Sequence, residues 1–193
     1  MPNLLKSIPE TMRKQGVPDN TITQFNIADT YSSEAVMDLI SQMDRLLTKE
    51  QRLSIMQEQG CCKTGIAPKG HLAFGRANAD KSLEEKVRLL NLSDMPHNAP
   101  CRLNGDGTLT VYWGAEDLSK RSCPCGIIKK LPEGAKVPIT FCGCCGGHIR
   151  SNYQKSLGAK LRLKEIVSSS SSSGGKKRCE FLFDVSMLQE DPK

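Results

Sequence analysis

The sequence has few aromatic side chains and no long apolar run. Its 193 residues include 5% aromatic and 38% hydrophobic residues. Because no stretch of about 18 apolar residues occurs, we expect no membrane-spanning helix. No early segment joins a basic stretch to an apolar run of about 7–15 residues, so we expect no secretory signal and a cytoplasmic location. The length allows a core of ordinary size without cysteine staples.

The common catalytic signatures are also missing. We find no G-x-S-x-G, no H-E-x-x-H, no phosphate loop and no G-x-G-x-x-G, which leaves the question of enzymatic activity open. The net charge is +6, from 27 Lys and Arg against 21 Asp and Glu. The basic surplus lies late in the chain without aromatic residues between its members. This pattern favours a solvated basic face over a nucleic-acid site.

Cysteine is abundant by contrast. The nine cysteines are Cys61, Cys62, Cys101, Cys123, Cys125, Cys142, Cys144, Cys145 and Cys179. In a reducing compartment such a set indicates metal binding or catalysis rather than a disulfide framework. The odd number also fits a fully paired framework poorly.

Most of these cysteines form two clusters with a histidine nearby. The first cluster is C-x-C, and the second is C-x-C-C followed by His148. Short apolar segments lie on either side of the turn at Pro132-Glu133-Gly134, which predicts a β-hairpin that brings the clusters together. The second cluster precedes a predicted helix over 148–157, and a helix N-terminus favours thiolate.

Thiolates in this number favour a metal site. Zinc takes four ligands in a tetrahedron, whereas the C-x₂-C-x₂-C run typical of many iron–sulfur sites is absent, so we expect zinc before an iron–sulfur cluster. Adjacent side chains diverge, so at most one of Cys144 and Cys145 enters a first shell. The candidate metal ligands are Cys123, Cys125, Cys142, Cys144, Cys145 and Cys179.

Two alternatives to a metal site stay open. One is a thiol-dependent redox or hydrolytic enzyme that uses Cys144 or Cys145 with His148 as the base. The other is a set of inert thiols, since free cysteine is often buried. Cys61 and Cys62 fit either a ligand role or a core role.

Periodicity and caps predict an α+β protein. Helices are expected over 33–47, 48–59, 82–91 and 148–157, and strands over 108–113, 161–166 and 179–185. Proline and glycine predict an irregular segment over 1–30 and a loop over 63–79 with a surface His71. The serine run over 168–173 is expected to be a mobile polar loop. Grouped elements of this order predict helices packed on a twisted antiparallel sheet.

The same pattern predicts how the chain is divided. Residues 1–100 form a mainly helical region, 101–187 a cysteine-rich sheet region, and 188–193 a tail. We expect the first two regions to form one compact unit.

The stretch over 141–185 resembles the 4-vinyl reductase domain family. Cys142 precedes a glycine-rich helix start, and the last strand reads C-x-F-x-F-x-V from Cys179. The resemblance implies an α+β fold, a cavity for small organic molecules and often a dimer. With the cysteine clusters, it leads us to expect a metal-binding module that binds a small molecule or acts as a sensor. It also implies a zinc site at Cys142, Glu165 and Cys179, with a fourth position that falls on Ser168. Because a serine hydroxyl is a poor zinc ligand, the other cysteines are expected to complete the site.

Overall fold

In the computed structural model the chain folds as α+β, which confirms the predicted class. The structure describes residues 3–60, 66–96, 98–114, 123 and 125–187. The elements are α1 (Leu4–Lys14), α2 (Asp19–Ile22), α3 (Ser33–Leu46), α4 (Lys49–Glu58), α5 (Ile66–Ala77), α6 (Leu83–Asn91), β1 (Cys101–Leu103), β2 (Thr108–Trp113), two 3₁₀ turns η2 (Ile128–Lys130) and η3 (Ile139–Cys142), α7 (Gly143–Leu157), β3 (Ala159–Ser168) and β4 (Cys179–Met187).

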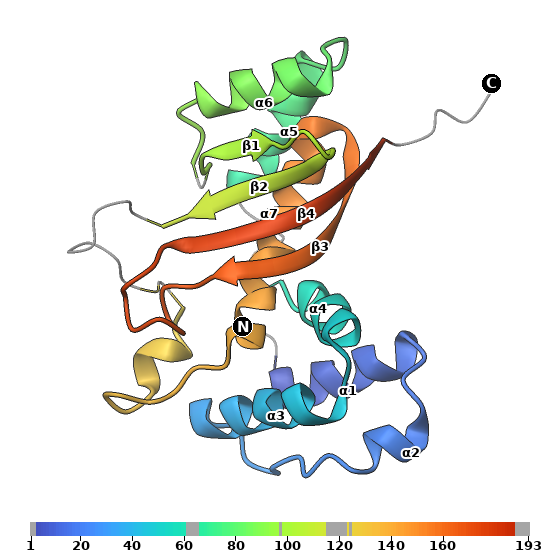
Figure 1. Ribbon diagram of the computed structural model, residues 1–193, viewed down its shortest axis with the longest axis vertical. Coiled ribbons are helices and arrows are strands. Elements are labelled where there is room, and N and C mark those ends of the chain that lie inside the picture. The colour runs from blue at the N-terminus through green and yellow to red at the C-terminus, as the bar shows by residue number, and fades with distance from the viewer. Residues whose placement is uncertain (1–2, 61–65, 97, 115–122, 124, 188–193) are drawn as a thin grey trace.

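The sheet is antiparallel with the strand order β1-β2-β4-β3. Alternation along β3 and β4 places Leu161, Leu163, Phe181 and Phe183 on the buried side. This side packs against α7, which runs behind the sheet in Figure 1. The first helices, α1 to α4, gather beside the N-terminal end of α7, and α5 and α6 lie toward its other end (Figure 1).

Glycine lets neighbouring helices approach α7 closely. A methyl group on Gly147 would collide with the backbone carbonyl oxygen of Gln57 in α4. A methyl group on Gly75 in α5 would collide with the carbonyl oxygen of Lys155. The Gln57 side chain also accepts a hydrogen bond from the backbone N–H of Leu163 at 3.0 Å, so α4 is bound to the edge of β3. The contacts of Gln57 hold the N-terminal half of α7 between α4 and the sheet, and the contact of Gly75 holds its C-terminal end against α5.

Several predicted elements are confirmed, and their caps explain them. Ser32 caps α3, Thr48 and Gln51 form a complete capping box at α4, and Ser82 caps α6. The helix predicted over 148–157 ends as expected, at Gly158 with a left-handed φ of 64°, but it begins earlier, at Gly143, so Cys144 and Cys145 lie within its first turn. The three predicted strands also form, as β2, β3 and β4.

Two segments predicted to be irregular are helical. The prediction for 1–30 is wrong over α1 and α2, whereas residues 23–30 form no helix or strand, as predicted. Leu4, Leu5, Ile8 and Met12 bury one face of α1, and Pro9 is tolerated within it. The loop predicted over 63–79 is wrong for its described part, which is α5. Tertiary packing rather than local propensity decides both cases, because tertiary contacts outweigh the cost of proline and glycine.

His71 is buried, which corrects its predicted surface position. Its side chain is 0% exposed, and Nδ1 lies 2.7 Å from the hydroxyl of Ser156 in α7. The ring also packs at a tilt against Tyr153, with centroids 5.4 Å apart. His71 therefore joins α5 to α7.

The predicted β-hairpin between the cysteine clusters is also wrong. The described part of this segment contains the 3₁₀ turns η2 and η3 and no strand. Pro138 lacks the N–H that a ladder requires, and it is the N-cap residue of η3 instead. Ile127 and Phe141 pack into the core formed by the first helices. The clusters are thus brought together by packing rather than by strand pairing.

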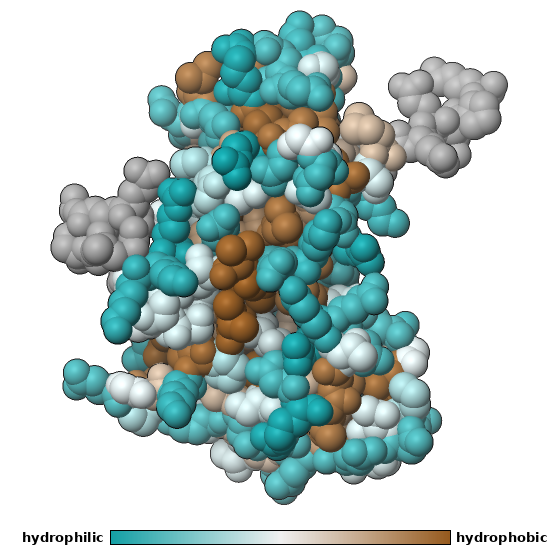
Figure 2. Space-filling model, in the orientation of Figure 1, coloured by the Kyte–Doolittle hydropathy of each residue, from teal (hydrophilic) through white to brown (hydrophobic). Residues whose placement is uncertain are grey.

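The outer surface is mixed in polarity. Figure 2 shows polar residues over most of one face, with a small apolar area over the middle of the sheet.

Within the described ranges, no helix combines the length and apolar character that a bilayer span requires.

Candidate functional site

Five of the six predicted metal ligands come from three separate chain segments. Cys123 and Cys125 precede η2, Cys142 ends η3, Cys145 lies in the first turn of α7, and Cys179 begins β4. We call these five residues the cysteine cluster. All five carry free thiols.

The η3 turn positions the second segment of the cluster. The hydroxyl of Thr140 donates a hydrogen bond to Oδ1 of Asp44 in α3 at 2.6 Å. Phe141 is buried among the first helices, while Cys142 joins the core beneath the sheet. Because η3 leads directly into α7, the position of Cys145 follows from the same anchors.

The sulfurs of the cluster influence one another. Burial is the main reason that the pKa values of Cys123, Cys142 and Cys179 lie above their ordinary value. Charge repulsion between the sulfurs adds to this effect: Cys125 and Cys142 raise the pKa of Cys123, and Cys123 raises that of Cys179. Such interactions require that the side chains share one region of low dielectric.

Cys145 is coupled to all the other members. Desolvation raises its pKa well above the ordinary value, and Cys142, Cys123, Cys125 and Cys179 raise it further. Without a cation beside it, the thiol of Cys145 is neutral at pH 7. A nucleophilic cysteine needs the opposite shift, so this environment disfavours the thiol-enzyme alternative for Cys145.

Cys144 faces a different environment from Cys145. Its thiol donates a hydrogen bond to the backbone carbonyl of Gln59 at 3.2 Å, and it packs at the core of the first helices. The ring of Tyr31 is nearby, since Cys144 contributes to the raised pKa of Tyr31 after desolvation and Cys125. The two adjacent cysteines therefore diverge, as the sequence predicts.

The serine run forms a turn after Ser168, the last residue of β3, and lies against the cluster rather than in solvent. Ser169 is 1% exposed and Ser170 is 8% exposed. The backbone N–H of Ser170 donates a hydrogen bond to Sγ of Cys179 at 3.3 Å, and the hydroxyl of Ser171 lies 3.3 Å from Sγ of Cys142. Sequence composition did not reveal this role, because serine-rich segments are commonly solvated.

The other residues implied by the family resemblance have partners of their own. Glu165 forms an ion pair with Lys49 of α4 at 3.1 Å. The hydroxyl of Ser168 donates a hydrogen bond to the carbonyl of Arg178 at 2.7 Å. His148, the predicted base, is 8% exposed, and its Nε2 lies 3.2 Å from the side-chain amide of Asn152.

The five sulfurs of the cysteine cluster suit a soft divalent metal, but their side chains do not surround a metal position in this arrangement. Among the residues that the structure describes, no group of three His, Cys, Asp or Glu side chains is placed to hold a metal ion. Zinc at about 2.3 Å from each sulfur requires the sulfurs to lie roughly 3.8 Å apart in a tetrahedron. The cluster would therefore have to contract around a metal. Cys61 and Cys62 lie outside the described residues.

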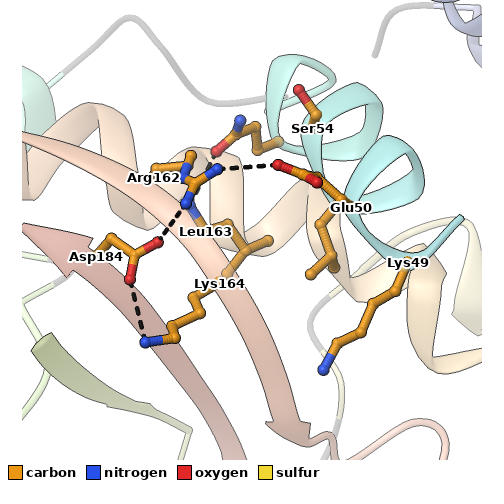
Figure 3. Close-up of a pocket in the computed structure, with 9 residues that line it drawn as sticks. Lys49, Glu50, Ser54, Arg162, Leu163, Lys164 and Asp184 are labelled. Carbon is orange, nitrogen blue, oxygen red and sulfur yellow. Dashed lines mark hydrogen bonds and ion pairs between the residues drawn. The ribbon is translucent and has the colours of Figure 1, made fainter.

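A surface pocket lies between α4 and the strands β3 and β4. Its volume is about 360 Å³, and its walls come from α4, β3 and β4. Arg162 bridges Glu50 at 3.1 Å and Asp184 at 2.9 Å, and Lys164 reaches the other oxygen of Asp184 at 3.3 Å (Figure 3). Leu163 in its wall also lies against Gly146, next to Cys145.

Comparison with known proteins identifies no family. No protein-family model matches the chain, and no curated protein matches it. An H-NOX protein from S. oneidensis in the Fe(II) ligation state aligns over 100% of this chain and 98% of its own, with 10% identity and a TM-score of 0.32. A likeness this weak supports no statement about fold or function. The resemblance to the 4-vinyl reductase domain family stays a prediction.

Proposed function

We propose that this protein is a zinc-binding module that binds a small molecule or acts as a sensor, and that the cysteine cluster supplies the zinc ligands. The observation that carries the proposal is the gathering of five thiols from three chain segments. Inert core cysteines have no reason to collect in one place, whereas a thiolate-bound metal requires it. Zinc would lower the pKa of the sulfurs that it binds and offset their mutual repulsion.

Backbone and side-chain donors around the sulfurs support the same proposal. The backbone N–H of Cys125 forms a hydrogen bond with the sulfur of Cys123, and Ser170 donates to Cys179. Metal-bound thiolates accept hydrogen bonds of this kind, which offset part of their charge. With five thiols and four positions on zinc, one cysteine of the cluster remains outside the first shell.

Elemental analysis of the protein purified without added metal tests the proposal. We expect about one zinc per chain, no visible absorption, and loss of metal in a variant that carries both Cys142→Ser and Cys179→Ser. A brown protein that contains iron and sulfide would indicate that the cluster holds an iron–sulfur centre instead of zinc. A metal-free protein that takes up no zinc and has one rapidly alkylated thiol would overturn the proposal in favour of the thiol enzyme.

The pocket of Figure 3 supports the small-molecule part of the proposal. Leu53 and Leu163 give it apolar walls, and Lys49, Arg162 and Lys164 give it three cations. A ligand with a carboxylate or phosphate would compete with the exposed Glu50 for Arg162. We expect Arg162→Ala to abolish, and Glu50→Gln to strengthen, the binding of such anions in a calorimetric screen. Anions that bind equally to all three proteins would place the ligand elsewhere.

A further inference from the structure

The serine run folds into a compact turn whose shape comes from its own hydroxyls. The hydroxyls of Ser169 and Ser172 lie 2.6 Å apart, and the N–H of Ser172 donates to Oγ of Ser169 at 3.0 Å. The N–H groups of Ser173 and Gly175 donate to the carbonyls of Ser169 and Ser170, at 3.2 Å and 2.8 Å. We call residues 169–173 the serine loop. It connects β3 to the segment before β4.

The serine loop directs its polar groups at three sulfurs of the cysteine cluster. Ser171 lies within hydrogen-bonding reach of both Cys142 and Cys123, which belong to different chain segments. The side chain of Ser169 also acts on Cys142, since it lowers the pKa of that thiol. The backbone N–H of Ser170 donates to Cys179. One short loop thus contacts all three segments that build the cluster.

Serine suits this position for a chemical reason. A zinc ion with four thiolates carries a net charge of about −2, which is costly to bury without compensation. A hydroxyl or a backbone N–H can donate to a thiolate, whereas a carboxylate would repel it and an alanine methyl could donate nothing. The side chain is also small enough for several donors to fit over one metal.

We propose that the serine loop is the hydrogen-bond-donating cover of the cysteine cluster and makes the site selective for metals bound by several thiolates. This inference rests on the proposed zinc-binding function. Ser171 is the main positioning residue, because its single hydroxyl joins Cys123 to Cys142. The loop stabilises the charge of the sulfurs and does not itself bind the metal.

Cobalt(II) reports on such contacts, since its thiolate charge-transfer bands respond to hydrogen bonding at sulfur. The full chain would be titrated with cobalt(II) and then with zinc as a competitor. We expect Ser171→Ala to keep the metal stoichiometry, to shift the charge-transfer bands to lower energy and to weaken zinc binding roughly 10–100-fold. Ser171→Thr retains the hydroxyl and should restore both the band position and the affinity.

Ser173→Ala is the matched control in the same loop. The described contacts of its hydroxyl are the carbonyl of Ser170 and the N–H of Lys177. If Ser171→Ala and Ser173→Ala give the same bands and affinities as the unchanged chain, the inference about the loop is wrong while the zinc site stands. If the unchanged chain binds neither metal, both proposals fail. Circular dichroism of each variant distinguishes a loss of metal binding from a loss of fold.

Discussion

Cys144 and Cys145 are neighbours in the chain, yet their thiols enter different environments. The thiol of Cys144 donates to the carbonyl of Gln59 beside the first helices. Cys145 interacts with the other four members of the cysteine cluster. The start of α7 at Gly143 explains the divergence, because successive residues on a helix point about 100° apart.

This divergence predicts different outcomes for two otherwise equal substitutions. We expect Cys145→Ser to reduce the zinc content to less than half. Cys145 interacts with all four other members of the cysteine cluster, so we assign it to the four zinc ligands rather than to the cysteine left over. Cys144→Ser should leave the zinc content unchanged, because its sulfur contacts a carbonyl instead. Elemental analysis of both variants, purified side by side, provides the measurement. Equal loss of zinc in the two proteins would contradict the assignment of ligands.

Removal of the metal should lower thermal stability. Zinc that binds only the folded chain stabilises it by about 4 kcal/mol when free zinc exceeds the dissociation constant 1,000-fold. For a chain of this length each kcal/mol corresponds to about 2–4 °C in Tm. We therefore expect a chelator to lower Tm by roughly 8–16 °C, measured by calorimetry, and added zinc to restore it. A Tm that the chelator leaves unchanged would argue against a structural metal.

Gly147 should be among the least replaceable residues in the chain. A methyl group there would collide with the carbonyl oxygen of Gln57, so α4 and α7 would have to separate. We expect Gly147→Ala to destabilise the fold by about 1–3 kcal/mol in urea unfolding.

Gly105 provides the control, because an added methyl group meets nothing within 4 Å there. Gly105→Ala should change stability by no more than about 0.5 kcal/mol. If both variants were equally stable, the close approach of α4 to α7 would not be a constraint on the fold.

Cys101 lies in β1 and is not one of the proposed ligands. We expect its ionisation to make the stability of the fold depend on pH in the alkaline range. Burial raises its pKa from 9.0 to about 12. Because the folded-state pKa is raised, the stability that Cys101 contributes is complete below pH 9 and is lost as pH rises from 9 toward 12.

A comparison with Cys101→Ala isolates this contribution from other groups that ionise at high pH. Between pH 9 and pH 11 the free energy of unfolding should fall more steeply for the unchanged chain than for the variant. Iodoacetamide should also label Cys101 in the unfolded chain and not in the native one at pH 9. Parallel stability curves, or fast native labelling, would show that this thiol is accessible.

The sequence by itself determined the α+β class and most elements with strong local signals. The capping box at Thr48 and Gln51 and the left-handed Gly158 are examples, because a cap depends on residues within one turn. The alternation along 179–185 likewise predicts which side chains of β4 are buried. The two cysteine clusters could be named as a candidate site from spacing alone.

Only the tertiary structure decided how the site is assembled. It replaced the predicted hairpin by 3₁₀ turns, made helices of segments that contain Pro9 and Pro68, and buried His71 against Ser156. It also placed the serine loop on the sulfurs of Cys142 and Cys179. The physical reason is common to these cases. Burial and hydrogen bonds between residues far apart in the chain outweigh local propensities, and one sequence pattern does not encode such pairings.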